Sequence, residues 1–317
     1  MTTSALHVPR RRVSPLLITF VVLVVLATAT SIASRLWTDK LWFDSVGFTG
    51  VFSTQLLTEL VLFGVGLLVM GGIVAVNLLV AYRLRPAARR RGPSAILDRY
   101  RDQIERSARL AVGVPAAVFG AMAGMSASGQ VLPVLAWLNR RSSGITDPKF
   151  GLDASFFMLE YPVWRLASGL VLGALIVGFL CAVVMHALVG NLLTGRPRTP
   201  SSVPSPVVRH LSALAGLVMI NFGIENLLDR YGLMLSPGGL LDGLKYTDDH
   251  ARLTAKLVVA VIAFIVAALF FVNVVISRGI IPVVGVVLMI VSSLILSLVY
   301  PAIVQGFTVK PNEPDKE

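Results

Sequence analysis

The stretch LVVAVIAFIVAALFFVNVVIS, residues 257–277, contains no aspartate, glutamate, lysine or arginine. An α-helix needs about 20 mainly apolar residues to cross the hydrocarbon core of a bilayer, so this stretch is long enough to span one. The pattern of such windows predicts an all-α fold, a polytopic membrane helix bundle of about seven transmembrane helices. The other windows lie at residues 13–34, 60–82, 110–139, 166–195, 211–224 (continuing past Glu225 to residue 228) and 279–309.

The whole chain is too apolar for a water-soluble domain. Of its 317 residues, 55% are hydrophobic and only 14% are charged, whereas soluble domains carry about 25% charged residues. The mean hydropathy is +0.79. We therefore expect the lipid bilayer to be the main partner. The net charge of +11 does not indicate a nucleic-acid partner, because the placement of the basic residues follows the expected membrane topology.

The windows divide the chain into three predicted parts. Residues 1–12 form a basic cytoplasmic tail, residues 13–306 form the transmembrane domain, and residues 307–317 begin an extracytoplasmic segment. A cleavable signal peptide is the rival interpretation of the first span, because Ala27-Thr28-Ala29 follows three arginines and an apolar stretch. The predicted spans lie near residues 13–35, 58–82, 110–130, 165–191, 208–228, 255–277 and 280–301.

Basic residues are concentrated in alternate connecting segments. Lysine and arginine accumulate in the cytoplasmic loops of membrane proteins, so we expect the N-terminus in the cytoplasm and the C-terminus outside the cell membrane. Asp98, Asp102 and Glu105 are the acidic residues on the predicted cytoplasmic side. The basic residues there are Arg10, Arg11, Arg12, the nine arginines of residues 83–109, Arg196, Arg198, Arg209 and Arg278.

The arginine-rich connection also contains a predicted amphipathic helix near residues 93–108. Such a helix would lie on the inner leaflet, where the arginines between Arg83 and Arg109 would meet anionic lipid headgroups. A solvated connecting helix is the alternative. The apolar residues at helical spacing are Ile96, Leu97, Tyr100 and Ile104.

Small residues predict close helix packing, because they let helix backbones approach where no hydrophobic effect drives association. The only cysteine, Cys181, lies in an apolar window, which excludes an intramolecular disulfide and predicts a packing role. The small residues at four-residue spacing are Ala116, Gly120, Gly124 and Ser128 in the third window, and Gly169 and Gly173 in the fourth.

The acidic residues of the predicted second outer loop are candidates for a binding site. Asp147 begins an Asp-Pro turn, and Asp153 is placed to cap a short helix around Phe156. In one interpretation Asp147, Asp153 and Glu160 bind a cation or a substrate. In the other, they are caps and a solvated edge.

Glu225 is the carboxylate that interrupts an otherwise apolar window, and Asp229 follows it by one helical turn. Intramembrane ionisable groups are costly, so they generally have a partner or a function. We expect either a structural ion pair, with Arg230 or Arg252 as the cation, or a transport or proton site.

Asp248, Asp249 and His250 form a polar cluster in the predicted third outer loop. Three adjacent residues cannot all point at one ion from a regular helix or strand, so we predict no metal site. Asp248 and His250 stay candidates for a functional role. His186, inside the fourth window, is expected to be a neutral packing residue.

The sequence contains no GxSxG, HExxH, Walker A or dinucleotide-binding motif. It also lacks an intramembrane ladder of arginines, and it lacks matching Gly/Pro-broken spans in two equivalent halves. These features would indicate a voltage sensor and a transporter site, respectively. We expect no cofactor, and the sequence leans away from an enzyme.

Four stretches of the chain resemble the UPF0182 family of uncharacterised multi-pass membrane proteins, which is common in actinobacteria. The resemblance implies that the chain carries only the N-terminal membrane part of a longer protein with a large extracytoplasmic region. It implies no activity and no site residues, because the family has none established. The matching stretches are Trp42-Phe43-Asp44, residues 147–153 with Phe156-Phe157, Tyr246-Thr247-Asp248 with residues 250–253, and residues 309–313.

Two functions from different classes stay open. The first is a membrane anchor or scaffold for an extracytoplasmic domain in envelope assembly or maintenance, with envelope proteins as partners. The alternative is a transporter or channel for an unknown solute, and an intramembrane enzyme lacks a catalytic constellation. Transport would require polar groups to converge on one water-accessible cavity at the midplane, whereas a scaffold would scatter them between helices. Those groups are Glu225, His186, Asn77, Asn221 and Asn273.

Overall fold

A computed structural model describes residues 14–85, 95–189, 206–236, 243–278 and 280–312. Most of these residues are helical, and the β-contact among them is one isolated bridge between Thr146 and Asp153. The basic tail predicted for residues 1–12 lies outside the described residues.

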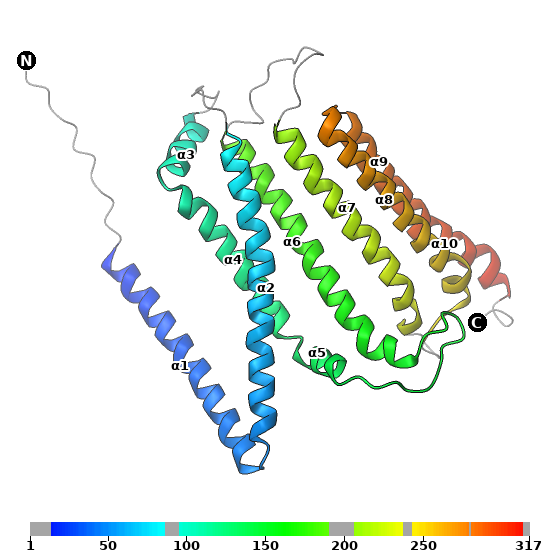
Figure 1. Ribbon diagram of the computed structural model, residues 1–317, viewed down its shortest axis with the longest axis horizontal. Helices are drawn as coiled ribbons and strands as arrows, with labels where there is room; N and C mark the ends of the chain where they lie inside the picture. The colour runs from blue at the N-terminus through cyan, green and yellow to red at the C-terminus, as the bar shows by residue number, and fades with distance from the viewer. Residues whose placement is uncertain (1–13, 86–94, 190–205, 237–242, 279, 313–317) are drawn as a thin grey trace, which may run out of the picture. The chain divides into compact units, whose positions relative to one another are not determined.

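Figure 1 shows the helices in chain order, with a short turn between α1 and α2 and a long loop over residues 139–153. Short π-helical or 3₁₀ turns extend several of them: η1 (Phe156–Glu160), η2 (Leu233–Leu235), η3 (Asp248–Arg252), η4 (Ile295–Val299), η5 (Gln305–Val309) and η6 (Lys310–Asn312). The α-helices of the described residues are α1 (Pro15–Ser45), α2 (Thr49–Arg83), α3 (Ala95–Arg106), α4 (Ala108–Ser128), α5 (Val131–Leu138), α6 (Tyr161–Leu188), α7 (Pro206–Gly232), α8 (Leu253–Ile276), α9 (Ile280–Leu294) and α10 (Tyr300–Val304).

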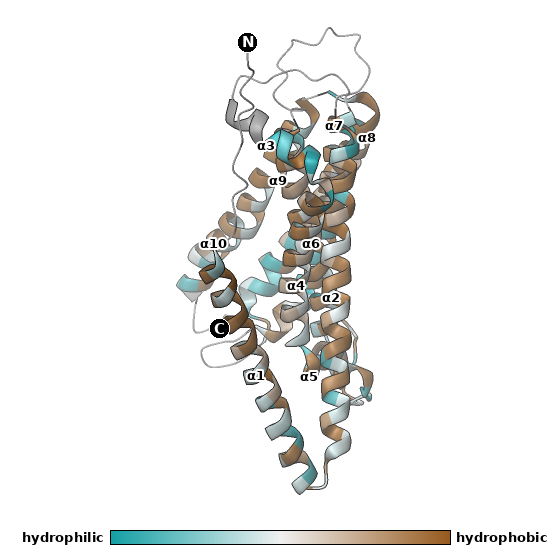
Figure 2. Cartoon of the chain, turned by 90° about the vertical axis from the view of Figure 1, so that its left-hand side faces the viewer, coloured by the Kyte–Doolittle hydropathy of each residue, from teal (hydrophilic) through white to brown (hydrophobic). Residues whose placement is uncertain are grey.

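Seven helical segments of the described residues are long and apolar enough to cross a membrane. Hydrophobic residues cover much of their length, and hydrophilic residues gather at α3 (Figure 2). The prediction of an all-α, polytopic bundle is therefore confirmed, because such helices satisfy their backbone groups internally and expose apolar side chains that lipid can solvate. The segments are Pro15–Ser45, Thr49–Arg83, Ala108–Ser128, Phe156–Leu188, Pro206–Leu235, Asp248–Ile276 and Ile280–Val309.

The chain divides into two compact units, Met1–Leu57 and Thr58–Glu317. In the first unit, α1 and the beginning of α2 form a helical hairpin. Gly47 makes the turn with φ +77°, a left-handed conformation that favours glycine. Thr49 Oγ1 donates a 2.7 Å hydrogen bond to Asp44 Oδ1 across this turn, and the rings of Phe43 and Phe52 lie 5.8 Å apart.

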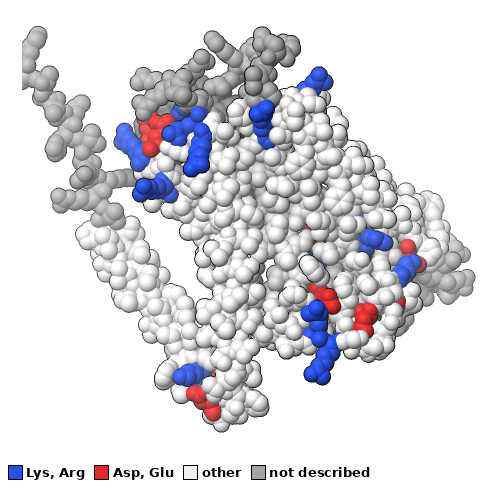
Figure 3. Space-filling model, in the orientation of Figure 1, with Lys and Arg blue, Asp and Glu red and all other residues white. Residues whose placement is uncertain are grey.

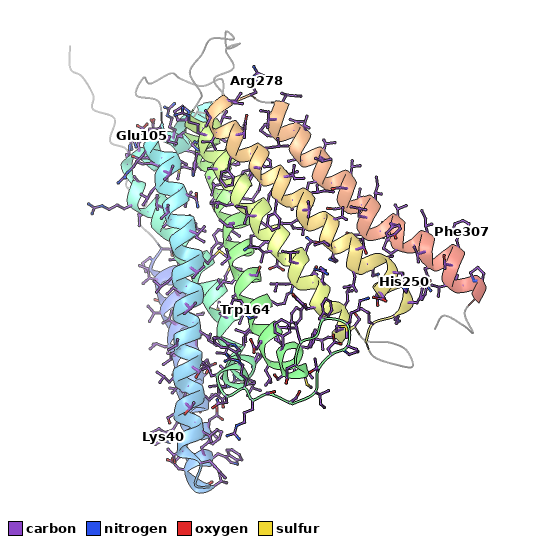
Figure 4. All side chains as sticks on the ribbon, turned by 45° about the vertical axis from the view of Figure 1, so that its right-hand side comes forward. Lys40, Glu105, Trp164, His250, Arg278 and Phe307 are labelled. Atoms are coloured by element: carbon purple, nitrogen blue, oxygen red, sulfur yellow. The ribbon has the colours of Figure 1, made fainter. Side chains whose placement is uncertain are left out.

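In the second unit, α6 packs against α7, α7 against α8, and α8 against α9 (Figure 1). The unit has two chemically different ends. The basic end contains α3 and the end of α8, where Figure 4 labels Glu105 and Arg278. The loop end contains the starts of α6 and α8, where Trp164 and His250 are labelled. Few charges appear on the surface between the two ends (Figure 3).

Helices α2 and α4 pack through glycines, which confirms the prediction for the third-window stripe. A Cβ atom added at Gly66 of α2 would lie 2.6 Å from the carbonyl oxygen of Ala123. A Cβ added at Gly120 of α4 would lie 2.9 Å from the carbonyl oxygen of Leu67. The two backbones thus approach so closely that only glycine fits at these positions.

The same prediction is wrong for Gly169 and Gly173 of α6. An added Cβ would meet nothing within 4 Å at Gly169 and only a Met70 side-chain atom, at 3.9 Å, at Gly173. The close approach of α6 occurs further along, at Gly178, where an added Cβ would lie 3.0 Å from Asn77 Nδ2. Spacing alone identifies a face of small residues but not the helix that meets it.

Candidate functional site

Four charged side chains from three helices form an ion network at the loop end. Arg165 of α6 contacts Glu225 Oε2 and lies 3.0 Å from Asp229 Oδ1. Asp229 Oδ2 accepts a 2.6 Å hydrogen bond from Lys256 Nζ of α8. Two positive and two negative groups therefore compensate one another where α6, α7 and α8 meet.

Helix geometry explains why these groups meet. Glu225 and Asp229 are one turn apart on α7, so both can point from one face of that helix. Glu225 is only 7% exposed, and a buried carboxylate without a counter-charge would be strongly unfavourable. The guanidinium of Arg165 supplies that counter-charge and links Glu225 to Asp229.

The expectation that Arg230 or Arg252 would be the cation for Glu225 is wrong. Arg230 lies over the ring of Phe150, with 5.9 Å between its Cζ atom and the ring centroid. Arg252 pairs with Asp248 one turn earlier, at 2.8 Å. Arg230 is five positions from Glu225 and Arg252 is 27 positions away, but each has another partner in the fold.

Sequence reasoning missed Arg165 and Lys256, although a signal existed. Each of these residues stands directly before a window that is free of charged residues, at positions 166–195 and 257–277. The fourth and sixth spans both begin at the loop end, where the fifth span ends, so their flanking cations face the carboxylates of α7. The relevant pattern is the charge at the ends of neighbouring antiparallel spans.

Asp153 organises the loop between α5 and α6. Its carboxylate accepts hydrogen bonds from the hydroxyls of Ser142 and Ser143 and from the backbone N–H groups of Ser143, Gly144 and Ser155. The Ser155 N–H lies at the start of the helical segment, as expected for a cap. The hydrogen bonds from Ser142, Ser155 and Ser143 hold the pKa of Asp153 well below its usual range.

This shift predicts the pH response of the loop. A carboxylate with a lowered folded-state pKa stabilises its loop above its unfolded pKa of about 3.9, and this stabilisation is lost as pH falls through the lower, folded pKa. We expect hydrogen-exchange protection of residues 142–155, corrected for intrinsic rates, to be equal at pH 7 and pH 4. Asp153→Asn should lose protection at both pH values, because one carboxylate oxygen becomes an NH₂ donor. A wild-type midpoint near pH 4 would contradict this mechanism.

Asp147 has a similar local role six residues earlier in the loop. Its Oδ2 accepts the backbone N–H groups of Lys149 at 3.0 Å and Phe150 at 2.6 Å. This arrangement projects Phe150 toward Tyr231 at the end of α7, with 5.0 Å between ring centroids. Phe156 also contacts Tyr231, with the rings edge to face at 5.2 Å. Asp147 therefore positions an aromatic cluster that joins the loop to α7.

Asp248 and His250 are neighbours with different surroundings. Asp248 is 1% exposed; it pairs with Arg252 and accepts the backbone N–H of Lys245 at 3.3 Å. His250 is exposed, and its ring stacks on Tyr246 with 4.0 Å between centroids. The two side chains do not converge on a common site.

Side chains join segments that are distant in the sequence at the loop end. Lys149 of the α5–α6 loop forms an ion pair with Asp249 of η3. Thr247, just before η3, donates a hydrogen bond to the side-chain oxygen of Gln305 in η5. The contacts therefore join the α5–α6 loop, η3 and the end of the last span into one layer.

A second polar cluster, the histidine chain, lies toward the basic end. His186 Nε2 of α6 lies 3.1 Å from His210 Nδ1 of α7, and His210 Nε2 lies 3.1 Å from Asn77 Oδ1 of α2. Asn77 Nδ2 donates to the carbonyl of Ile73 at 2.7 Å, which leaves Oδ1 as the acceptor toward His210. With neutral rings, the hydrogen bonds then run from His186 through His210 to Asn77. His186 is fully buried, and sequence reasoning did not single out its partner His210.

The described residues also line a partly open apolar cavity of about 650 Å³ at the basic end. It lies between α2, α3, α4 and α6. Its lining includes neither the ion network nor the histidine chain. Of the polar groups expected to converge for transport, Glu225 belongs to the ion network, whereas His186 and Asn77 belong to the histidine chain, and none of the three lines this cavity.

The model of the family described as "Uncharacterised protein family (UPF0182)" matches residues 16–317. This chain belongs to the UPF0182 family. That result confirms the resemblance found in the four sequence stretches. No solved structure matches the chain.

Bacterial UPF0182 relatives match nearly all of the chain. A UPF0182 protein of a Nocardioides species is 39% identical over 312 residues, which cover 97% of this chain and 30% of the relative. One from Frankia casuarinae is 35% identical over 319 residues, covering 100% and 31%. One from Streptomyces coelicolor is 38% identical over 316 residues, covering 98% and 31%. The chain thus spans about 30% of the length of these UPF0182 relatives.

Within this UPF0182 chain, the predicted candidates fall into three groups. Glu225 and Asp229 meet in the ion network. Asp147 and Asp153 order the α5–α6 loop. Asp248 and His250 belong to η3. In the part of the chain that the structure describes, no group of three or more His, Cys, Asp or Glu side chains is arranged to hold a metal ion.

Proposed function

We propose that this chain is a membrane anchor and scaffold module of the cell membrane, whose helix bundle holds an extracytoplasmic domain during envelope assembly or maintenance. The observation that carries the proposal is the set of side-chain contacts that join different segments at the loop end. Lys149 and Asp249, Phe150 and Tyr231, and Thr247 and Gln305 join segments that are distant in the sequence. A layer fixed by its own side chains can hold an attached domain in a defined position.

The distribution of polar groups supports a scaffold over a transporter. Glu225 and His210 are separated by 15 positions on α7, which corresponds to about 22 Å along the helix axis. Asn273 of α8 donates a 2.8 Å hydrogen bond to Ser212, which is two positions from His210 on α7. The ion network and the histidine chain thus fasten helices to one another at two separate levels, an arrangement that supports the scaffold.

The length of the relatives is the second support. The UPF0182 relatives are about three times as long as the part that matches this chain. The last span ends at the loop end, where Gln305 of η5 contacts Thr247, the residue before η3. With the basic end in the cytoplasm, the loop end faces outward. A polypeptide that follows the last span would then emerge beside the tied layer.

The experiment is affinity purification of the tagged protein from its native membranes, with quantitative mass spectrometry of the proteins that co-purify. Lys149→Glu should reduce envelope-protein partners at least several-fold, because it places like charges beside Asp249. The charge swap, Lys149→Glu with Asp249→Lys, should restore them. Arg278→Glu, at the basic end, is the matched control and should change nothing.

A different pair of results would contradict the scaffold. If no envelope protein co-purifies, and if proteoliposomes show solute flux that Glu225→Gln abolishes without lowering protein yield, the transport alternative is correct. A scaffold role for Glu225 predicts instead that Glu225→Gln lowers the yield of folded protein, because a neutral amide cannot balance Arg165.

A further inference from the structure

We infer that the apolar cavity at the basic end binds an acyl chain of an anionic phospholipid, whose phosphate lies against the arginines at the junction of α3 and α4. This inference is independent of the scaffold proposal. It assigns a ligand class to a site that the ion network and the histidine chain do not use.

The lining of the cavity identifies an apolar occupant. Aliphatic and aromatic side chains such as Leu78, Phe119 and Met185 form its inner wall. Its volume of about 650 Å³ falls in the range of about 300–1,000 Å³ that is typical of ligand pockets. Water in such a cavity would lack hydrogen-bond partners, and an empty cavity would lose packing contacts. A hydrocarbon chain satisfies both requirements.

The outer wall of the cavity faces the membrane. Leu110 is 64% exposed and Val184 is 57% exposed, and both line the cavity. On a transmembrane bundle, such exposed apolar side chains are in contact with lipid. A lipid can therefore enter laterally, without a path through the protein.

The polar residues of the lining lie on the α3 side, which points to the headgroup position. Tyr100, Gln103 and Ser107 line the cavity there. Arg106 and Arg109 are exposed on either side of Ser107. Positive charge gathers around α3 in Figure 3. Basic pockets between membrane helices on this kind of surface bind anionic headgroups.

The remaining charges near α3 do not cancel this preference. Arg101 pairs with Glu105 at 3.6 Å, so this pair contributes little net charge. Asp102 is the other acidic side chain described on α3, and it is exposed. The segment 83–109 as a whole contains nine arginines and three acidic residues. An anionic headgroup is therefore favoured over a zwitterionic one.

The test is native mass spectrometry of the full chain released from nanodiscs that contain equal amounts of phosphatidylglycerol and phosphatidylcholine with identical acyl chains. Wild-type protein should retain phosphatidylglycerol preferentially. Removing both charges with Arg106→Gln and Arg109→Gln should reduce that preference by about fivefold for each arginine. Arg278→Gln removes an arginine elsewhere at the basic end and should leave the preference unchanged.

The acyl-chain part of the inference has its own variants. Ala111→Trp places a large ring in the cavity lining and should reduce retention of both lipids several-fold. Ala117→Trp, on the exposed face of the same helix and outside the lining, is the matched control. If Ala111→Trp alters the elution profile of the protein, Cys181→Leu is used in its place, because it adds less volume to the cavity.

The inference is overturned if phosphatidylglycerol and phosphatidylcholine are retained equally by the wild type, or if the arginine variants match Arg278→Gln. It is also overturned if Ala111→Trp and Cys181→Leu both bind lipid as Ala117→Trp does. A co-purifying hydrophobic peptide that occupies the site and excludes lipid would identify a different occupant and overturn it as well.

Discussion

Arg165→Met should destabilise the bundle by about 3 kcal/mol, at the lower end of the range for breaking a buried ion pair. The substitution leaves Glu225 buried at 7% exposure without its counter-charge. The lower end applies because the Arg165 side chain is 36% exposed, so water and headgroups screen part of the loss. The measurement is the thermal or denaturant midpoint of the purified protein in detergent, compared with wild type.

Two further variants show whether the effect comes from the buried charge. Arg165→Met combined with Glu225→Met removes both partners and should recover most of the lost stability, since Asp229 keeps Lys256. Arg140→Met breaks the exposed pair with Glu160 and should cost less than about 1 kcal/mol. Equal losses in Arg140→Met and Arg165→Met would mean that burial of Glu225 does not matter.

The same substitution at two nearby glycines of α2 should have opposite effects. Gly66→Ala should destabilise the protein by about 1–3 kcal/mol, because the new Cβ would lie 2.6 Å from a backbone oxygen of α4, and backbone cannot move aside as a side chain can. Gly64→Ala should stabilise it by up to about 1 kcal/mol, since an added Cβ there meets nothing within 4 Å and alanine favours the helix.

The readout for this pair is again the unfolding midpoint in one detergent. Both positions lie on the same helix and receive the same methyl group, so changes in expression or detergent binding affect them alike. Gly120→Ala, on the facing helix, should resemble Gly66→Ala. A stabilised Gly66→Ala protein would exclude the close α2–α4 packing.

The sequence was sufficient for the helical architecture because bilayer thickness fixes how long an apolar span must be. Each apolar window corresponds to one of the seven spans, and this includes the fifth window, which Glu225 interrupts. The amphipathic pattern near residues 93–108 similarly lies where the structure has α3. The side chains of Ile96 and Leu97, which were part of that pattern, lie outside the described residues.

The partners of the polar residues were less predictable. The sequence did not identify Arg165 as the partner of Glu225, because the two residues are 60 positions apart. Only the packing of α6 on α7 brings them together. His210 was missed for the same reason, since its partners are on α2 and α6. Local reasoning succeeded for Asp153, whose acceptor role is defined within its own loop. Whether these residues have a role beyond structure stays a prediction.

The measurement that tests the membrane architecture most directly is labelling of single cysteines with a membrane-impermeant maleimide, in a Cys181→Ser background. Thr146→Cys probes the loop end, and Asp102→Cys probes the exposed side of α3. We expect Thr146→Cys to be labelled in intact cells and Asp102→Cys only after permeabilisation. Labelling of both in intact cells, or of Asp102→Cys alone, would contradict a bundle that spans the cell membrane with its basic end in the cytoplasm.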